Sequence, residues 1–171
     1  MSQTTNYLSP RPLSKGYFRN AFDCGVEPLN DYIQKFALQN QKKDAARTYV
    51  VVNTENQVLG YYTLVFGSVE PDDVPNDISS GLGRYQIPII MLARLAVDLS
   101  EKGKGLGGVL IQDAFLRAIQ AAEIAGLRAV MVQAKDEMAR SFYEKIGFIR
   151  SPSDQLNLLL KISEIRSNLK G

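Results

Sequence analysis

A glycine-rich segment carries the clearest chemical signal in the sequence. Residues Lys102–Gly107 read KGKGLG and stand between an apolar run ending at Val97 and a long stretch with helical periodicity. Glycine lets backbone N–H groups turn outward into a concave nest, and a helix N-terminus adds about half a positive charge. With Lys102 and Lys104, these groups favour a phosphate or pyrophosphate. The plainer interpretation is a glycine turn with solvated lysines, because short glycine motifs are common.

This segment differs from two well-known phosphate-binding motifs. It is not a P-loop, because no Lys-Ser/Thr pair follows at the required spacing. It is not a dinucleotide-binding fingerprint either, because it comes late in the chain, after an expected antiparallel hairpin. The next expected strand, Ala129–Gln133, also lacks a terminal acid for a ribose.

Residue counts restrict the chemistry further. The 171 residues include no histidine, which excludes Ser-His-Asp triads, Cys-His dyads and His-ligated zinc. Any general base must therefore be a carboxylate, Tyr, Lys, a backbone group or water. The single cysteine, Cys24, excludes an intramolecular disulfide and favours a reducing compartment. Cys24 is expected to be a small buried hydrophobe.

Tyr143 is a candidate proton donor. It lies in Glu137–Ile146, which is expected to form a short helix closed by Gly147. A phenol has an ordinary pKa of about 10, so it keeps its proton at neutral pH and can act as a general acid. The group to protonate would be a departing thiolate, whose thiol titrates near 8.5. From spacing alone, an aromatic packed in the core or in a groove is the plainer interpretation.

The charge of the chain is uneven. The net charge of +2 is too small to indicate a nucleic-acid binder. Between Arg11 and Arg47, however, seven cations stand against four anions. This local excess is compatible with an RNA-binding surface, although a solvated helix face is the plainer interpretation. The candidate RNA-binding residues, including two arginines from later segments, are Lys35, Lys42, Lys43, Arg47, Arg84 and Arg94.

Hydrophobic periodicity predicts one α/β domain with a mixed sheet. No apolar run approaches the ~18 residues of a membrane helix. Residues 1–10 are expected to be loosely ordered and residues 164–171 to form a tail. In the expected helix 28–43, five residues at three-and-four spacing form one apolar face: Leu29, Tyr32, Ile33, Phe36 and Ala37. The other expected elements are a hairpin (47–54 and 57–69), a loop (70–88), a strand (89–97), a helix to about 125, a strand (129–133), a helix (137–146) and a last strand (156–162).

Two segments resemble a known family. RLAVDLSEKGKGLGGVLIQDAF, followed by VQAKDEMARSFYEKIGF, resembles the GNAT superfamily of N-acetyltransferases. The acetyl-CoA loop of that family reads Arg/Gln-x-x-Gly-x-Gly/Ala, and residues 102–107 fit it with Lys in the first place. Further segments between residues 11 and 162 are similar to the tRNA-acetylating toxins (TacT-like and AtaT-like) of bacterial toxin–antitoxin pairs. These segments include FDCGVEPLNDYI, ARTYVVV, GYYTLVFGSV and the closing LLL run.

The resemblance implies a fold and a site. The fold is a single GNAT domain over residues 1–171, with a mixed, mostly antiparallel central sheet splayed in a V and flanked by helices. Acetyl-CoA is the co-substrate, no metal is needed, and Tyr143 is the catalytic residue beside the sulfur. The implied cofactor-binding residues are Leu95, Ala96 and Val97 for the pantetheine, Lys102, Gly103, Lys104, Gly105, Leu106 and Gly107 for the pyrophosphate, and Ser141, Phe142 and Lys145 along the groove.

The resemblance also implies a cytoplasmic toxin that acetylates the α-amine of aminoacyl-tRNA and blocks translation. Its implied partners are aminoacyl-tRNA, a ribbon-helix-helix antitoxin, operator DNA through that antitoxin, and a second copy in a homodimer. An α-amine titrates at about 7.7–8.0, against about 10.4 for lysine, so a site without histidine suits it better. Two alternatives stay open: an acetyltransferase of small amines or of protein amines, with the acidic segment 70–77 as a cation site, and a non-catalytic co-repressor.

Overall fold

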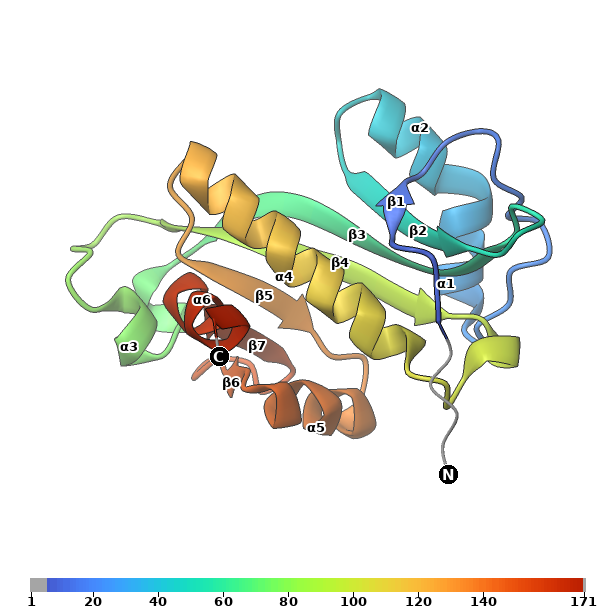
Figure 1. The fold of residues 1–171 in the computed structure, drawn as a ribbon. Helices are drawn as coiled ribbons and strands as arrows, with labels where there is room; N and C mark the ends of the chain where they lie inside the picture. Colours follow the sequence, from blue (N-terminus) through green and yellow to red (C-terminus); the bar gives the residue numbers. More distant parts are fainter. Residues whose placement is uncertain (1–5, 171) are drawn as a thin grey trace. The chain divides into compact units, whose positions relative to one another are not determined.

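The computed structural model describes residues 6–170, and Figure 1 shows its helices and strands. Seven strands form one sheet in the order β1-β2-β3-β4-β5-β7-β6. The elements in chain order are β1 (Arg11–Pro12), α1 (Glu27–Asp31), the π-helical turn η1 (Tyr32–Phe36), α2 (Ala37–Lys42), β2 (Arg47–Val52), β3 (Val58–Val69), the 3₁₀ turn η2 (Pro71–Asp73), α3 (Asn76–Ser79), β4 (Ile87–Val97), the 3₁₀ turn η3 (Leu99–Glu101), α4 (Leu106–Ile124), β5 (Ala129–Gln133), α5 (Glu137–Ile146), β6 (Ile149–Arg150), β7 (Asn157–Lys161) and α6 (Ile162–Lys170).

The pairing of the strands confirms a mixed sheet. β1, β2 and β3 pair antiparallel, as do β5, β7 and β6, whereas β4 and β5 pair parallel. The parallel register runs from Ile89 opposite Ala129 to Leu92 opposite Val132. β4 itself continues to Val97, so its last residues, after Leu92, do not pair with β5. The residues expected to contact pantetheine belong to this continuation.

The described chain divides into two compact units. Unit 1 comprises residues 6–65 and 93–114, and unit 2 comprises residues 66–92 and 115–170. β3, β4 and α4 have residues in both units. The glycine segment belongs to unit 1 and Tyr143 to unit 2. Each unit is therefore described by itself.

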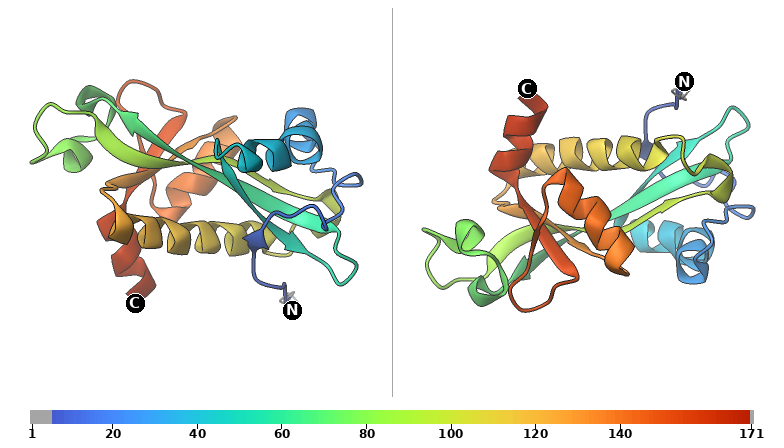
Figure 2. Two further views of the ribbon diagram at one scale, coloured as in Figure 1. Left: turned by 90° about the horizontal axis from the view of Figure 1, so that it is seen from above. Right: turned by 90° about the horizontal axis from the view of Figure 1, so that it is seen from below.

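In unit 1, the β2–β3 hairpin is covered on both faces. Figure 2 shows the helical segment 27–42 on one face of these strands and the start of α4 on the other. On the first face, the hydroxyl of Tyr61 donates a hydrogen bond to the carbonyl of Leu29 at 2.7 Å, and its ring stacks on Tyr32. On the second face, Gly60 lies against Leu106 and Leu110 of α4. The hairpin thus holds the start of α4, the helix that follows the glycine segment, in position.

The expected helix 28–43 is present, but a π-helical turn interrupts it. The N–H of Ala37 donates to the carbonyl of Tyr32, which is the five-residue spacing of a π-helix. Ala37 is fully buried beneath that turn, whereas Phe36 is 51% exposed. The apolar face expected from the spacing is therefore buried at Ala37 and exposed at Phe36. The wider turn places Ala37 in the core and turns Phe36 outward.

In unit 2, the segment expected to be a loop is a packed part of the core. It contains η2 and α3, and Val74 and Ile78 are buried against β4, β5 and β7. Arg128 donates from Nε to the carbonyl of Ile78 at 2.9 Å. Lys161 Nζ pairs with Asp77 at 2.8 Å. The prediction of a single long loop over 70–88 is wrong, because two apolar side chains fold it onto the sheet.

The expectation of a C-terminal tail is also wrong for the described residues. The chain continues from β7 into α6, which buries Ile162 and Ile165. At the other end, the hydroxyl of Tyr7 donates to Glu101 at 3.0 Å, which holds the chain before β1 to unit 1. The expectations for residues 1–5 and 171 lie outside the described residues. Among residues 6–170, no helix is long and apolar enough to cross a membrane.

Candidate active site

The glycine segment leads directly into α4 and leaves open space in front of it. Gly103 and Gly105 have φ values of +79° and +87°, the left-handed region that glycine adopts without strain. A Cβ atom at Gly103, Gly105 or Gly107 would meet no atom within 4 Å. The first N–H groups of α4 have no acceptor within the helix. The segment therefore presents backbone donors to a clear space, and this arrangement fits a pyrophosphate.

Asp98 holds the base of this segment. One carboxylate oxygen accepts hydrogen bonds from the N–H and hydroxyl of Ser100, at 3.0 and 2.7 Å. The other accepts the N–H of Asp23 at 2.9 Å, and the N–H of Leu99 donates back to the carbonyl of Asp23 at 2.8 Å. Burial raises the pKa of Asp98, but these hydrogen bonds outweigh it and hold the pKa below its ordinary value. Asp98 thus joins the glycine segment to a turn far away in the sequence.

Glu101 adds a second anchor beneath the same segment. Its carboxylate accepts the hydroxyls of Tyr7 and Ser100 and pairs with Lys104 at 3.5 Å. Lys102, by contrast, is exposed and has no ion-pair partner among residues 6–170. It is therefore available to an incoming phosphate.

Gly60 on β3 sets how closely α4 approaches the sheet. A Cβ atom there would lie 2.9 Å from Leu106, 3.1 Å from Leu110 and 3.3 Å from the carbonyl oxygen of Ala96. Only glycine allows this approach. Because Leu106 is the first residue of α4, Gly60 determines the position of the helix N-terminus. The sequence analysis missed both Gly60 and Asp98. An isolated glycine inside a β-rich run was the available signal for Gly60.

α5 positions Tyr143 in unit 2. The helix begins at Asp136, whose side chain accepts the N–H of Ala139 at 2.9 Å. It ends at Gly147, which has a φ of +122°, and the N–H of Phe148 then donates to the carbonyl of Tyr143. This cap brings Phe148, which is buried, against the phenol ring with centroids 5.5 Å apart. Phe142 packs edge-on at 5.3 Å.

The environment of Tyr143 keeps its phenol protonated. Burial raises the pKa of Tyr143 to about 12. The hydroxyl has no hydrogen-bond partner among residues 6–170 and is free to donate to a ligand. The phenol is a weaker acid than an ordinary tyrosine. Protonation of a free thiolate, whose thiol titrates near 8.5, would be unfavourable by about 3.5 pKa units, or about 5 kcal/mol.

The other expected cofactor residues lie on the elements predicted to carry them. Ser141, Phe142 and Lys145 are on the exposed side of α5 in unit 2. The last three residues of β4 are in unit 1, where Ala96 is buried and Leu95 and Val97 are half-buried. Within each unit, the expected residues therefore stand together on one short stretch of chain.

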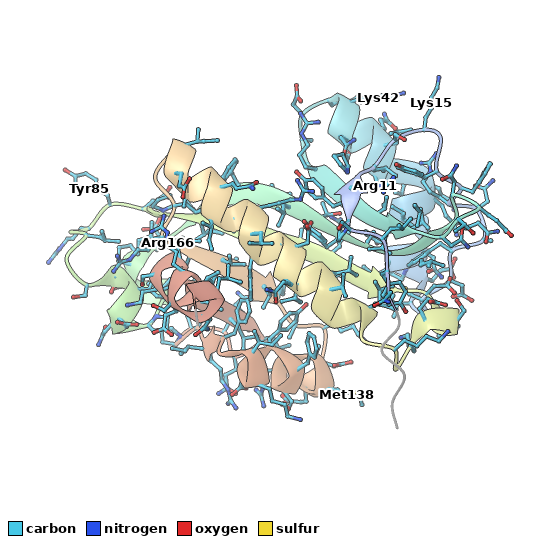
Figure 3. All side chains as sticks on the ribbon, in the orientation of Figure 1. Arg11, Lys15, Lys42, Tyr85, Met138 and Arg166 are labelled. Atoms are coloured by element: carbon cyan, nitrogen blue, oxygen red, sulfur yellow. The ribbon has the colours of Figure 1, made fainter. Side chains whose placement is uncertain are left out.

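The expected RNA-binding cations do not all lie in the same unit. Lys35, Lys42, Lys43 and Arg47 lie in unit 1, in or just after the helical segment 27–42. Figure 3 shows the side chain of Lys42 pointing away from the strands of that unit. Arg94, also in unit 1, lies 3.6 Å above the ring of Tyr32.

Arg84 is in unit 2, where it faces acidic residues. It lines a pocket of about 630 Å³ with Glu70, Pro71, Asp72 and Asp73. Because acidic side chains surround Arg84, it is poorly suited to bind a polyanion such as RNA.

Comparison with known proteins places this geometry in a family. Residues 45–150 match the model of the acetyltransferase (GNAT) domain. Over 163 residues the chain is 38% identical to a tRNA-acetylating toxin of Mycobacterium tuberculosis, covering 95% of this chain and 97% of that protein.

Solved structures agree with the sequence comparison. A crystal structure of a tyrosine-to-phenylalanine mutant of KacT superposes with a TM-score of 0.89 and 26% identity, over 95% of this chain and 99% of that one. AtaT complexed with acetyl-methionyl-tRNAfMet has a TM-score of 0.88 and 28% identity, over 94% and 98% of the two chains. AtaTR bound with AcCoA has a TM-score of 0.81 and 28% identity, over 95% and 98%.

Two further neighbours are complexes with other macromolecules. One is an AtaT mutant toxin bound to the C-terminus of the antitoxin AtaR, with a TM-score of 0.81 and 28% identity over 94% of this chain and 96% of that one. The other is the KacTA–DNA complex, with a TM-score of 0.78 and 28% identity over 95% and 96%. The matching domain model, the 38% identity over nearly the whole chain and the sheet of seven strands lead to one assignment: this chain belongs to the GNAT acetyltransferase family.

Proposed function

We propose that this protein transfers an acetyl group from acetyl-CoA to the α-amine of aminoacyl-tRNA and thereby blocks translation. The observation that carries this proposal is the 38% identity to a tRNA-acetylating toxin over 95% of the chain. The structural neighbours that are bound with AcCoA and complexed with acetyl-methionyl-tRNAfMet support it. We further propose that the two units act together as one acetyltransferase domain.

Unit 1 would bind the co-substrate. The N–H groups of Gly103, Gly105 and the first turn of α4 would receive the pyrophosphate, with Lys102 and Lys104 adding mobile positive charge. The N–H of Lys104 donates to the carbonyl of Glu101 at 3.3 Å. Asp98 and Glu101 keep this segment in shape without ligand, so little ordering is needed on binding. The backbone of Leu95, Ala96 and Val97 would hold the pantetheine.

Tyr143 would act at the sulfur of acetyl-CoA. Ser141, Phe142 and Lys145 would contact the same co-substrate. Bound acetyl-CoA supplies the acetyl thioester. As the C–S bond breaks, the hydroxyl of Tyr143 would donate its proton to the departing sulfur. Because its pKa is about 12, the phenol cannot remain a phenolate, and it regains a proton as the attacking nitrogen loses one. The sulfur thus gains one proton and the nitrogen loses one, with Tyr143 between them.

The absence of histidine from the chain favours an α-amine as the acetyl acceptor. The attacking amine must be neutral, and an α-amine reaches neutrality about two pKa units lower than lysine does. The chain contains no histidine to remove a proton. We propose that Lys35, Lys42, Lys43 and Arg47 contact the phosphates of the tRNA, with Arg94 in the same unit. Arg84 is the weakest of the proposed contacts, because acidic residues surround it.

The partners follow from the same relatives. We propose that a cognate ribbon-helix-helix antitoxin neutralises this protein and that the pair binds its operator DNA. Complexes of AtaT with the C-terminus of AtaR and of KacTA with DNA support this proposal. We also propose that the protein acts in the cytoplasm, where charged tRNA is found, and as a homodimer.

A second candidate function is acetylation of a small amine or of protein amines. The pocket of about 630 Å³ lined by Glu70, Asp72 and Asp73 favours it, because a polyamine is a cation. The two functions are separated by offering acetyl-CoA with total charged tRNA, with polyamines and with a basic protein. The proposed function requires transfer to charged tRNA alone. Transfer to polyamines would support the second candidate, and acetyl-CoA binding without any transfer would support a non-catalytic co-repressor.

A further inference from the structure

The π-helical turn η1 ends on an exposed aromatic side chain, although the apolar spacing of the helical segment 27–42 includes it. Ala37, not Phe36, takes the core position, with its N–H bonded to the carbonyl of Tyr32. Phe36 is left 51% exposed. π-turns are rare and concentrate at functional sites, because a helix without them is better hydrogen-bonded. An exposed phenylalanine at such a turn therefore calls for a ligand.

The surroundings of Phe36 indicate what kind of ligand it takes. From Tyr32 to Lys43, the exposed residues are Lys35, Phe36, Gln39, Lys42 and Lys43, with no acid among them. Residues three and four apart are neighbours on a helix, so Phe36, Gln39 and Lys43 form one stripe. Lys42 and Lys43 have no ion-pair partner in the described chain, and Lys35 pairs only with Asp31, at 3.2 Å. An exposed aromatic on a helical segment with three exposed lysines, two of them without an ion-pair partner in the described chain, suits a single-stranded nucleic acid.

We propose that Phe36 is a stacking platform for an unpaired base in the 3′-terminal single strand of the acceptor RNA. Lys35, Lys42 and Lys43 of the same helical segment contact the phosphates, and the ring of Phe36 holds one base. This inference rests on the proposed function, because it takes tRNA as the acceptor. It adds a recognition element for the unpaired end, which every charged tRNA presents next to the amine to be acetylated. A duplex stem alone offers no base face for the ring.

The absence of tryptophan from the chain provides a direct reporter. In Phe36→Trp, the only indole lies at the proposed platform. An acceptor-stem RNA hairpin with an unpaired 3′ tail should quench its fluorescence, and the same hairpin without the tail should quench it much less. Phe36→Leu keeps an apolar side chain but removes the ring. Its KM for charged tRNA should rise about tenfold, while its KM for acetyl-CoA stays unchanged.

Phe18→Leu is the matched control, because Phe18 is another exposed aromatic of unit 1, outside the helical segment 27–42. It should keep both KM values. Unchanged KM for charged tRNA in Phe36→Leu, or equal quenching by the two hairpins, would overturn the inference. A change in oligomeric state on substitution of Phe36, seen by sedimentation, would also overturn it, because the face would then be a contact between copies. Acetylation of charged tRNA by the unmodified protein tests the proposed function separately.

Discussion

Replacement of Gly60 by alanine tests how the sheet positions the cofactor segment. The added Cβ would lie 2.9 Å from a methyl group of Leu106, closer than real Cβ contacts. It would also lie 3.1 Å from a methyl group of Leu110 and 3.3 Å from the carbonyl of Ala96, which is tighter than most real contacts. The two leucine methyl groups can turn aside, whereas the carbonyl belongs to β4 and cannot. The two leucine side chains therefore have to repack, and this repacking shifts the first turn of α4 away from β3.

The cost can be bounded from these contacts. Overpacking of a core by a methyl group costs about 1–3 kcal/mol, and the two movable contacts favour the lower part of that range. For a chain of this size, about 2–4 °C of melting temperature is lost per kcal/mol. A displacement that removes about 1.4 kcal/mol of pyrophosphate binding weakens the affinity for acetyl-CoA about tenfold.

Calorimetric titration with acetyl-CoA and thermal unfolding measure both effects. Gly67→Ala is the control, because Gly67 is also on β3 and a Cβ there meets its nearest atom, in Ile89, at an ordinary contact distance of 3.5 Å. It should melt at the same or a higher temperature. A Gly60→Ala protein that melts several degrees lower but binds acetyl-CoA as tightly as the unmodified protein would refute the reasoning. The helix start would then not depend on its distance from β3.

Three other predictions concern the site itself. Gly105→Asp should abolish measurable acetyl-CoA binding in a folded protein, because a carboxylate would enter an anion nest at a φ of +87°; unchanged calorimetric affinity would remove the segment from the cofactor site. Tyr143→Phe should lower kcat by about 10²–10⁴-fold and leave acetyl-CoA affinity within a few-fold, whereas near-normal single-turnover acetylation would exclude the phenol as proton donor. Asp98→Asn should unfold at lower denaturant concentration at neutral pH. Because the native pKa of Asp98 lies below its unfolded value, this deficit should begin to shrink as the pH falls below about 4 and should vanish below the native pKa. A deficit independent of pH would contradict the role of the charge.

Local patterns predicted the parts of the site that lie on one stretch of chain. The glycines between a buried strand and a helix predicted the start of α4, and the closing Gly147 predicted the end of α5. Both depend on backbone preferences of a few neighbouring residues. The roles of Asp98 and Gly60 could not be predicted in this way. Asp98 bonds to Asp23, 75 residues away, and Gly60 acts through a helix that begins 46 positions later.

The exposure of Phe36 shows a second limit. Its spacing from Tyr32 and Ile33 fits an ordinary amphipathic helix, and no residue type marks the place where a π-turn is inserted. Ala37, directly after the turn, packs in the core of unit 1, a tertiary contact that local spacing does not reveal. α6 was missed for a related reason. Only Ile162 and Ile165 anchor it, and its other residues are mostly polar.

The central claim is that the acetyl group goes to the α-amine of an amino acid esterified to tRNA. The most direct measurement is incubation of the purified protein with acetyl-CoA and total charged tRNA, followed by nuclease digestion and mass spectrometry of the released aminoacyl adenosines. We expect N-acetylated aminoacyl adenosines, far fewer of them at equal time with Tyr143→Phe, and none with deacylated tRNA. Acetylation of nucleobases, or no acetylated aminoacyl adenosine at any protein concentration, would contradict this claim.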